Sequence, residues 1–311
     1  MRFLGQQPPY DLTYNDVFMV PSLSQVPSRF DVDLTTPDQL GTTIPVVVSN
    51  MTAVAGRRMA ETVARRGGLT VLPQDIPLDI IDAVIQYVKT RHLVYDTPIT
   101  LNGSNTVGDA LGLIHKRAHG AVVVIDSDGR PEGIFTEHDA VGYDRFTQLQ
   151  NAMSRELVVI KDGADASEIY ERLSDVRLSV APVVDGDGRL VGCVTRKGAL
   201  RSTFYTPAVD KAGRLLIAAA VGINGDPAAK AKALIAMGAD VLVIDTAHGH
   251  QQRTLHAIEE VRAVAPNIPI VAGNVVTVEG TRDLINAGAR SEEHTSELQS
   301  HLNLVCRLLL E

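Results

Sequence analysis

Val241-Leu242-Val243-Ile244-Asp245 is an apolar run that ends in a carboxylate, and a helical pattern follows it over residues 251–264. A short apolar run without polar alternation is typical of a strand that is buried on both faces. The same order recurs immediately, with a strand predicted over 268–272 and a helix over 278–287. Gly288 then stands where a helix C-cap is expected. Strands that alternate with helices predict an α/β fold with a parallel sheet.

The same rhythm extends toward the amino terminus. Helices are predicted over 57–66, 76–90 and 227–237, and each follows or precedes an apolar run. An eight-stranded (β/α) barrel needs three more strands than this pattern supplies. The sequence therefore predicts an incomplete (β/α)8 TIM barrel with five strands, at residues 44–49, 69–72, 215–221, 241–245 and 268–272.

The middle of the chain contains an internal repeat. Residues 126–136 match residues 185–195 at a constant offset of 59 residues, so that Gly129 corresponds to Gly188 and Thr136 to Thr195. Each copy has an apolar strand, an Asp/Gly turn and a second strand, which is typical of a β-hairpin. A helix is predicted before each copy, over 107–118 and 167–176. We expect the two copies to pack together, because each is too small for a core of its own.

These patterns predict three parts of the chain. Residues 1–92 and 206–289 form one α/β domain, and residues 93–205 form a repeat domain inserted into it. Residues 290–311 depart from both patterns, and 290–300 resemble the translation of a sequencing-adapter oligonucleotide. The interpretation is a foreign tail without function, in which Cys306 is an accident. The alternative is a polar loop followed by a short helix.

Composition excludes several classes of protein. The net charge of −8 argues against nonspecific nucleic-acid binding, and aromatic residues at 4% argue against a base-stacking platform. No apolar stretch approaches the ~20 residues of a membrane helix. Two cysteines exclude a disulfide scaffold and a multi-cysteine zinc site. We therefore expect a cytoplasmic protein that binds neither nucleic acid nor a membrane.

Asp245 is the strongest candidate site residue. It ends a buried strand, at the edge where parallel barrels build their sites, and its carboxylate can accept hydrogen bonds from ribose hydroxyls. Gly249 allows close approach of the backbone to a ligand. The alternative is that Asp245 or Thr246 caps a helix. His248 and His250 could form a metal pair, but no third ligand is evident and no metal is expected.

Other candidates follow neighbouring strands. Asn274 can donate and accept hydrogen bonds toward a sugar or a nicotinamide, or it can simply form a turn after Gly273. Ser49 and Met51 follow the first strand. A methionine can pack against a flat base, although a core methionine is the alternative.

Several motifs, in order along residues 1–289, resemble the IMP dehydrogenase/GMP reductase family. They are Leu12 to Pro21, Ile44 to Met51, Gly67-Gly68, Asp245 to His250 and Gly273-Asn274-Val275. The resemblance implies a purine nucleoside monophosphate substrate, NAD or NADP as cofactor, a homotetramer and, in the family enzyme, a monovalent cation. It implies a cofactor-side set of Asp245, Thr246, His248, Gly249 and Asn274, and a substrate-side set of Ser49, Asn50, Met51 and Gly273.

The repeat resembles a tandem pair of CBS modules, which this family carries as an insertion. In the first copy, Thr136 could contact a phosphate and Asp139 the ribose hydroxyls of an adenine or guanine nucleotide. The second copy has Thr195 but Gly198 in place of the aspartate. The resemblance therefore implies at most one intact nucleotide site, and a purely structural pairing module is the alternative.

The family reaction uses a cysteine that attacks the purine C2 to form a thioimidate. That cysteine lies in a loop after the sixth strand, which this sequence lacks. Cys193 is expected in the core, so we expect the chain itself to be inactive. The run Asn50 to Gly56 resembles a reductase branch that retains CBS modules, and favours GMP reductase. IMP dehydrogenase is one alternative, and a non-catalytic CBS nucleotide sensor is another.

Overall fold

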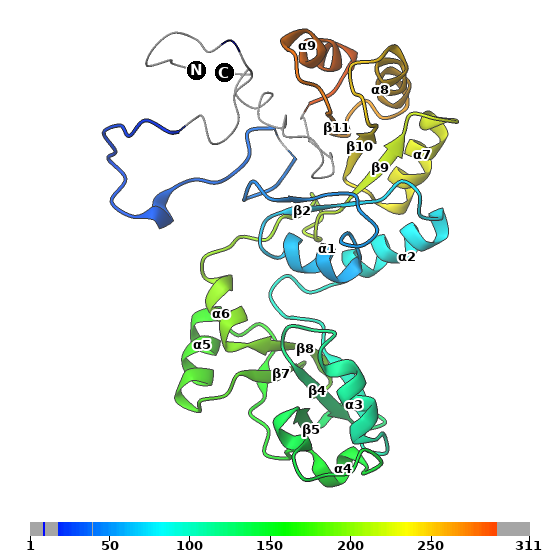
Figure 1. The fold of residues 1–311 in the computed structure, drawn as a ribbon. Coiled ribbons are helices and arrows are strands. Elements are labelled where there is room, and N and C mark those ends of the chain that lie inside the picture. Colours follow the sequence, from blue (N-terminus) through cyan, green and yellow to red (C-terminus); the bar gives the residue numbers. More distant parts are fainter. Residues whose placement is uncertain (1–8, 10–17, 39, 291–311) are drawn as a thin grey trace. The chain divides into compact units, whose positions relative to one another are not determined.

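A computed structural model describes residue 9, residues 18–38 and residues 40–290. The chain forms two compact units. Unit 1 comprises residues 1–90 and 207–311, and unit 2 comprises residues 91–206. Unit 2 is therefore an insertion in the sequence of unit 1. In Figure 1, whose colours follow the sequence, the elements from α3 to α6 belong to unit 2.

The described strands of unit 1 form one parallel sheet. β2 pairs with β9, so strands that precede and follow the insertion are direct neighbours. All four pairings are parallel, as the alternating pattern predicts. The predicted α/β fold is confirmed as a parallel half-barrel sheet with the order β1 (Val47–Val48), β2 (Leu69–Leu72), β9 (Ala218–Gly222), β10 (Val241–Asp245) and β11 (Ile270–Ala272).

Three of the predicted strands differ in their bounds, and one of them, predicted at residues 268–272, begins only at Ile270. Residues 44–46 are not in β1, since Pro45 has no N–H to donate to a sheet. The apolar run at residues 44–49 predicts a strand that is buried on both faces. Val46 and Val47 are 47% and 41% exposed, so this prediction is wrong. Leu215 is paired with Val209 instead of with the sheet, which is why β9 begins only at Ala218.

Helices cover one face of this sheet. Figure 1 shows α7, α8 and α9 outside β9, β10 and β11. Gly238 and Gly288 end α7 and α9 in the left-handed conformation, with φ of 102° and 119°, so the C-cap predicted at Gly288 is confirmed. This arrangement leaves the carboxyl ends of all five strands at one edge. The helices of unit 1 are α1 (Arg57–Ala64), α2 (Leu78–Lys89), α7 (Pro227–Met237), α8 (Gln252–Val264), α9 (Val278–Ala287) and a 3-10 turn at Arg29–Asp31.

A core of small and branched apolar residues fills the sheet of unit 1. Alternate residues of the strands, such as Ala218 and Ala220 or Val241 and Val243, pack together with Leu40 and other apolar side chains from outside the sheet. The core therefore holds the strands in a fixed register, which fixes the positions of the residues at their carboxyl ends.

Unit 2 consists of two copies of one pattern. Each copy has a parallel strand pair and a hairpin, and the sheet orders are β3-β4-β5 and β6-β7-β8. A bulge lies at Val124/Ile125 in the first hairpin and at the equivalent Val183/Val184 in the second. The predicted repeat of hairpins is thus confirmed. The elements are β3 (Ile99–Asn102), α3 (Val107–Ile114), β4 (Ala121–Ile125), β5 (Pro131–Thr136), a 3-10 turn (His138–Ala140), α4 (Leu149–Ala152), β6 (Ile160–Lys161), α5 (Ala166–Asp175), β7 (Val180–Val184), β8 (Leu190–Thr195) and α6 (Arg196–Ser202).

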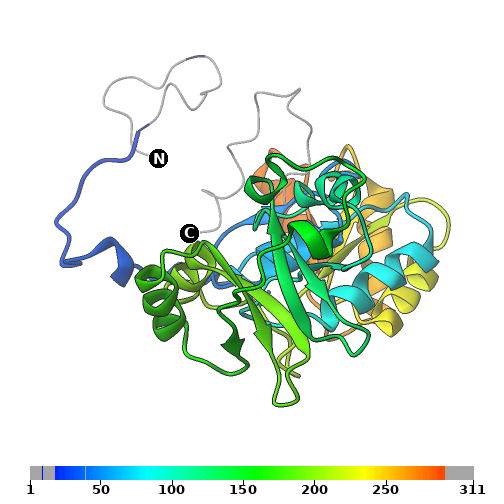
Figure 2. The same ribbon diagram turned by 90° about the horizontal axis from the view of Figure 1, so that it is seen from below.

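The two copies contact each other. The N–H of Leu190 donates to the Gly129 carbonyl at 2.9 Å, and Arg130 Nε donates to the Asp187 carbonyl at 3.2 Å. Figure 2 shows the two hairpins side by side. Cys193 is fully buried with Ala121 and Val180 between them, as expected for a core residue.

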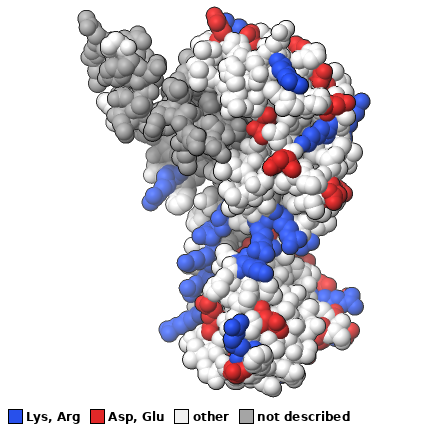
Figure 3. All heavy atoms as spheres, turned by 45° about the vertical axis from the view of Figure 1, so that its right-hand side comes forward, with Lys and Arg blue, Asp and Glu red and all other residues white. Residues whose placement is uncertain are grey.

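The surface carries charges of both signs. Figure 3 shows basic and acidic side chains on each unit, interspersed with uncharged ones. None of the described helices is both long enough and apolar enough to cross a membrane.

Candidate functional site

Asp245 is the centre of the polar cluster at the carboxyl edge of the unit 1 sheet. It is the last residue of β10, and its Oδ2 accepts a hydrogen bond of 2.6 Å from Asn50 Nδ2. Asn50 lies two residues after β1, so the fold joins positions 195 residues apart. This bond connects the expected cofactor side with the expected substrate side. The helix-cap alternative for Asp245 is wrong, because Gln251 is the N-cap of α8.

Two residues that the sequence did not single out complete this cluster. The side chain of Gln74, which follows β2, hydrogen-bonds to the Asp245 carboxylate. Lys230 of α7 donates from Nζ to the backbone carbonyl of Gln74. Gly222 ends β9 beside them, and a Cβ there would collide with the Gln74 side-chain oxygen. The one available signal was that Gln74 follows a buried strand, whereas Lys230 is one lysine among several in a helix.

Burial and the neighbouring charges have opposing effects on the pKa values of this cluster. Burial raises the pKa of Asp245, and Asp75 adds to this, while Asn50, Gln74 and Lys230 act to lower it. Burial also lowers the pKa of Lys230, against the attraction of Asp75 and Asp245. A carboxylate and an amine that burial perturbs in opposite directions are typical of a site that handles a polar ligand.

The loops after β10 and β11 are in direct contact. The N–H of Gly249 donates to the Asn274 carbonyl at 3.0 Å, and a Cβ on Gly249 would collide with the Gly273 carbonyl oxygen. Asn274 itself adopts a left-handed φ of 58°, which is the turn conformation that the alternative for this residue describes. Gly249 therefore allows the backbones of these two loops to approach each other closely, in addition to any approach of the backbone to a ligand.

The remaining cofactor-side candidates are held by local hydrogen bonds. Gln251 Nε2 donates to Thr246 Oγ1 at 3.0 Å and to the His248 carbonyl at 2.7 Å. His250 Nε2 lies 2.9 Å from Asp283 Oδ2 of α9. Among the described residues there is no group of three metal-ligating side chains. Hydrogen bonds from the Gln251 amide and to backbone carbonyls thus hold the loop from Asp245 to Gln251 in place.

Ser49 and Met51 lie in a turn after β1. The N–H of Met51 donates to the Ser49 carbonyl at 2.8 Å. The Met51 side chain is 42% exposed, so the interpretation of a core methionine is wrong. An exposed thioether at the carboxyl edge is available to pack against a flat ligand.

In unit 2, the two copies differ at their candidate nucleotide positions. The N–H and Oγ1 of Thr136 both donate to Asp139 Oδ2 at 2.7 Å. The Thr195 hydroxyl accepts from the N–H of Gly198 at 2.8 Å and caps α6. The structure therefore brings Thr136 and Asp139 together, and gives Thr195 a capping role.

Some sequence-based expectations lie outside the described residues. They are the greater part of the motif Leu12 to Pro21, residues 291–311 of the expected foreign tail, and Cys306. Of the expected tail only Arg290 is described, and its N–H donates to the Ile270 carbonyl at 2.8 Å. Within the described ranges, Cys193 is the cysteine present, and it is buried.

Comparison with known proteins agrees with this arrangement. GMP reductase of Mycobacterium tuberculosis (strain ATCC 25618 / H37Rv) is 57% identical over 290 residues, covering 93% of this chain and 60% of the relative. Inosine-5'-monophosphate dehydrogenase of Halalkalibacterium halodurans is 35% identical over 284 residues, covering 89% and 58%. The crystal structure of GMP reductase from Trypanosoma brucei in complex with guanosine 5'-triphosphate matches with a TM-score of 0.59 and 29% identity, covering 91% of this chain and 70% of that one.

The chain thus spans about 60% of the length of the curated GMP reductases that it matches. A family model described as "IMP dehydrogenase / GMP reductase domain" matches residues 11–291. This match includes both segments of the parallel sheet and the loops that carry Asn50, Asp245 and Asn274. The chain belongs to the IMP dehydrogenase/GMP reductase family.

Proposed function

We propose that this chain carries the nucleotide-binding part of a GMP reductase, which converts GMP to IMP with NADPH. The observation that carries the proposal is the hydrogen bond between Asn50 and Asp245, which joins the two loops that the family resemblance assigns to the substrate and to the cofactor. Identity favours the reductase, at 57% against 32–35% for the IMP dehydrogenases compared. IMP dehydrogenase, with IMP and NAD, is the second candidate because the matching family model covers both enzymes and IMP dehydrogenases are 32–35% identical.

Each residue of the edge has a defined role in this proposal. The Asp245 carboxylate accepts hydrogen bonds from ribose hydroxyls of the dinucleotide, and Asn50 orients it. Met51 offers an apolar surface to the purine, beside Ser49 and Gly273. The nicotinamide dinucleotide, when bound, supplies the hydride. The chain's own residues bind and align the two nucleotides. This alignment raises the rate of hydride transfer, because the reacting groups are held close together.

For unit 2 we propose a tandem CBS module. Thr136 and Asp139 would hold an adenine or guanine nucleotide, and the second copy would hold none. The support is the shared hairpin pattern and the loss of the aspartate at Gly198. The homotetramer and the monovalent cation implied by the resemblance stay predictions.

The chain by itself is expected to bind nucleotides without turning them over. The family reaction needs a cysteine at the purine C2, and the cysteine that the described residues contain, Cys193, is buried in unit 2. An assay of NADPH absorbance with GMP should therefore stay at background. Turnover of GMP above background would contradict this expectation.

Binding is the direct test of the proposed site. Calorimetric titration with GMP, NADPH, IMP and NAD should give tighter binding for GMP and NADPH if the reductase assignment is right. Asp245→Asn should weaken dinucleotide binding about tenfold or more, because a hydrogen bond to a charged group is worth about 1.5–3 kcal/mol. Glu259→Gln, on the exposed surface of α8, is the matched control. A folded chain that binds none of the four nucleotides would overturn the proposal.

A further inference from the structure

Lys230 is a lysine of α7 that the proposed function does not use. It is the fourth residue of the helix, and its side chain is neither fully exposed nor fully buried. Its Nζ reaches the Gln74 carbonyl, on the loop after β2. The helix thus delivers an amine to the carboxyl edge of the sheet, next to the residues that surround Asp245.

The charged groups around this amine are few. Asp245 at the end of β10 and Asp75 after β2 both attract it. Asn50 and Gln74, whose side chains hydrogen-bond to Asp245, are uncharged amides. The backbone carbonyl of Gln74 accepts a hydrogen bond from Lys230, and its side chain hydrogen-bonds to Asp245. Gln74 thus links the amine of Lys230 to the carboxylate of Asp245.

We propose that Lys230 is a positioning residue that keeps the Asp245 carboxylate ionised and in place to accept hydrogen bonds from a ligand's hydroxyl groups. The proposal rests on the proposed function only for the identity of that ligand, a nicotinamide dinucleotide. Lys230 acts through charge on Asp245 and through the Gln74 backbone, and it need not touch the ligand.

The physical reason is a competition at Asp245. Burial and the neighbouring Asp75 favour the protonated acid, which has less capacity to accept hydrogen bonds. A positive charge nearby favours the carboxylate, and the bond from Asn50 does the same. Removal of Lys230 should therefore raise the pKa of Asp245. Ligand binding that needs the carboxylate would then fail at a higher pH than in the wild type.

The chain offers a matched control on the same helix. Lys232 is two residues further along α7 and is exposed, so its removal changes net charge equally without changing the cluster. Lys230→Arg keeps the charge, and Lys230→Met keeps much of the apolar stem. If Lys230→Met does not fold, Lys230→Gln, which keeps a hydrogen-bond donor, replaces it.

The experiment is a 13C NMR titration of the aspartate carboxyl carbons in the 311-residue chain, with Asp245→Asn identifying the Asp245 signal. We expect Lys230→Met to raise the pKa of Asp245 by about 0.5 or more, since an adjacent opposite charge shifts a carboxyl pKa by about 1–3. Lys232→Met should leave it within about 0.2 of the wild type, because the charge of an exposed lysine is strongly screened by solvent. Lys230→Arg should do the same, because it keeps the positive charge at this position. An unchanged or lowered pKa in Lys230→Met would overturn the proposal.

A second measurement separates this proposal from the proposed function. NADPH affinity is measured from pH 5 to 8 for the same variants. A charge role moves the pH at which affinity falls, whereas a merely structural role lowers affinity equally at every pH. If the wild type binds no NADPH while Lys230→Met still raises the Asp245 pKa, the dinucleotide assignment fails and the role of Lys230 stands.

Discussion

Gly249 shows how one residue sets the geometry of the site. Its Cα lies against the Gly273 carbonyl, and any Cβ at this position would collide with that backbone oxygen. We predict that Gly249→Ala separates the loops after β10 and β11. The unfolding free energy should fall by about 1–3 kcal/mol, the usual cost of overpacking, when measured by urea denaturation. Nucleotide affinity should fall as well, because Asn274 moves with its loop.

Gly186→Ala is the control for this prediction. Gly186 is exposed in the turn between β7 and β8, its φ is not left-handed, and a Cβ there would meet nothing within 4 Å. Its replacement should change the unfolding free energy by less than about 0.5 kcal/mol. Equal stabilities of Gly249→Ala and Gly186→Ala would show that the two loops do not need their close contact.

At the scale of single residues, the sequence predicts one kind of site residue well and another poorly. Asp245 and Gly249 follow a buried strand, and the carboxyl edge of a parallel sheet is where such residues meet. Lys230 lies within a helix, where lysine is an ordinary surface residue. Its place beside Asp245 depends on how α7 packs on β9, which is a tertiary contact without a local pattern.

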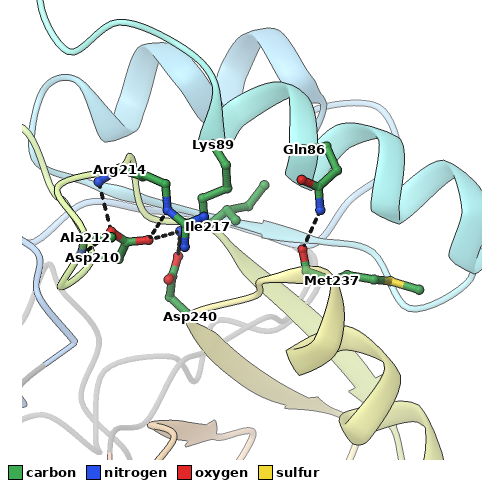
Figure 4. Close-up of polar contacts among 8 residues, drawn as sticks. All are labelled: Gln86, Lys89, Asp210, Ala212, Arg214, Ile217, Met237 and Asp240. Carbon is green, nitrogen blue, oxygen red and sulfur yellow. Dashed lines mark hydrogen bonds and ion pairs between the residues drawn. The ribbon is translucent and has the colours of Figure 1, made fainter.

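At the scale of elements, a buried lysine connects the segments on either side of the insertion. Lys89 ends α2, just before the chain leaves unit 1, and Asp210 follows its return. Lys89 Nζ lies 2.9 Å from Asp210 Oδ2 and 2.6 Å from Asp240 Oδ2, just before β10, as Figure 4 shows. Asp240 also accepts the N–H of Ile217 at 2.9 Å. One amine thus fixes the start of β9 and β10 relative to α2.

We predict that Lys89→Met destabilises the chain by about 3 kcal/mol or more. The Lys89 side chain is 3% exposed, and its removal leaves the carboxylates of Asp210 and Asp240, which are 10% and 16% exposed, without their counter-charge. Urea denaturation at pH 7 measures the loss. Lys211→Met, at an exposed lysine next to Asp210, is the control and should be near neutral. A small effect of Lys89→Met would show that the pair is replaceable by apolar packing.

The same network predicts a dependence on pH. Burial opposes ionisation of Asp210, but the N–H of Arg214, the Lys89 amine and the N–H of Ala212 lower its pKa from 3.8 to about 2. A lowered pKa in the folded state stabilises the fold above the unfolded value, and this contribution is lost as pH falls through about 4 to about 2. The difference in unfolding free energy between wild type and Asp210→Asn should therefore shrink across that window. Burial raises the pKa of Asp240, so this residue contributes the opposite dependence of stability on pH. Asp240 is therefore kept in both of the proteins compared. A constant difference would contradict the assignment to Asp210.

The elements themselves were predictable where local pattern and tertiary pairing agree. Residues 69–72, 227–237, 241–245 and 278–287 have the predicted bounds. The error at residues 215–217 arose because an apolar run carries no information about its partner. Leu216 donates its N–H to Ala208, on the returning segment, and so it does not join the sheet.

At the scale of the whole molecule, the two units differ in how completely they bury their apolar side chains and pair their strand edges. Unit 2 contains its own apolar clusters, one for each copy and one between them. In unit 1, β1 and β11 each pair on one side only within the described sheet. Apolar side chains of its first described segment are largely exposed, with Phe18 at 74% and Leu23 at 94%. Unpaired strand edges and exposed apolar side chains favour association between chains.

We therefore predict that residues 91–206 alone are monomeric and melt cooperatively, while the 311-residue chain associates. Light scattering after size-exclusion chromatography measures the mass, and circular dichroism follows the melt. Association should increase with salt, because screening weakens the repulsion between chains of net charge −8 but leaves apolar attraction intact.

Val47→Lys, at the exposed edge strand β1, should reduce association, since a lysine on a strand edge opposes pairing with another chain. Val176→Lys is the control, because Val176 is similarly exposed but follows a helix of unit 2. A 311-residue chain that is monomeric and melts in one cooperative step would show that the described sheet edges are covered within a single molecule.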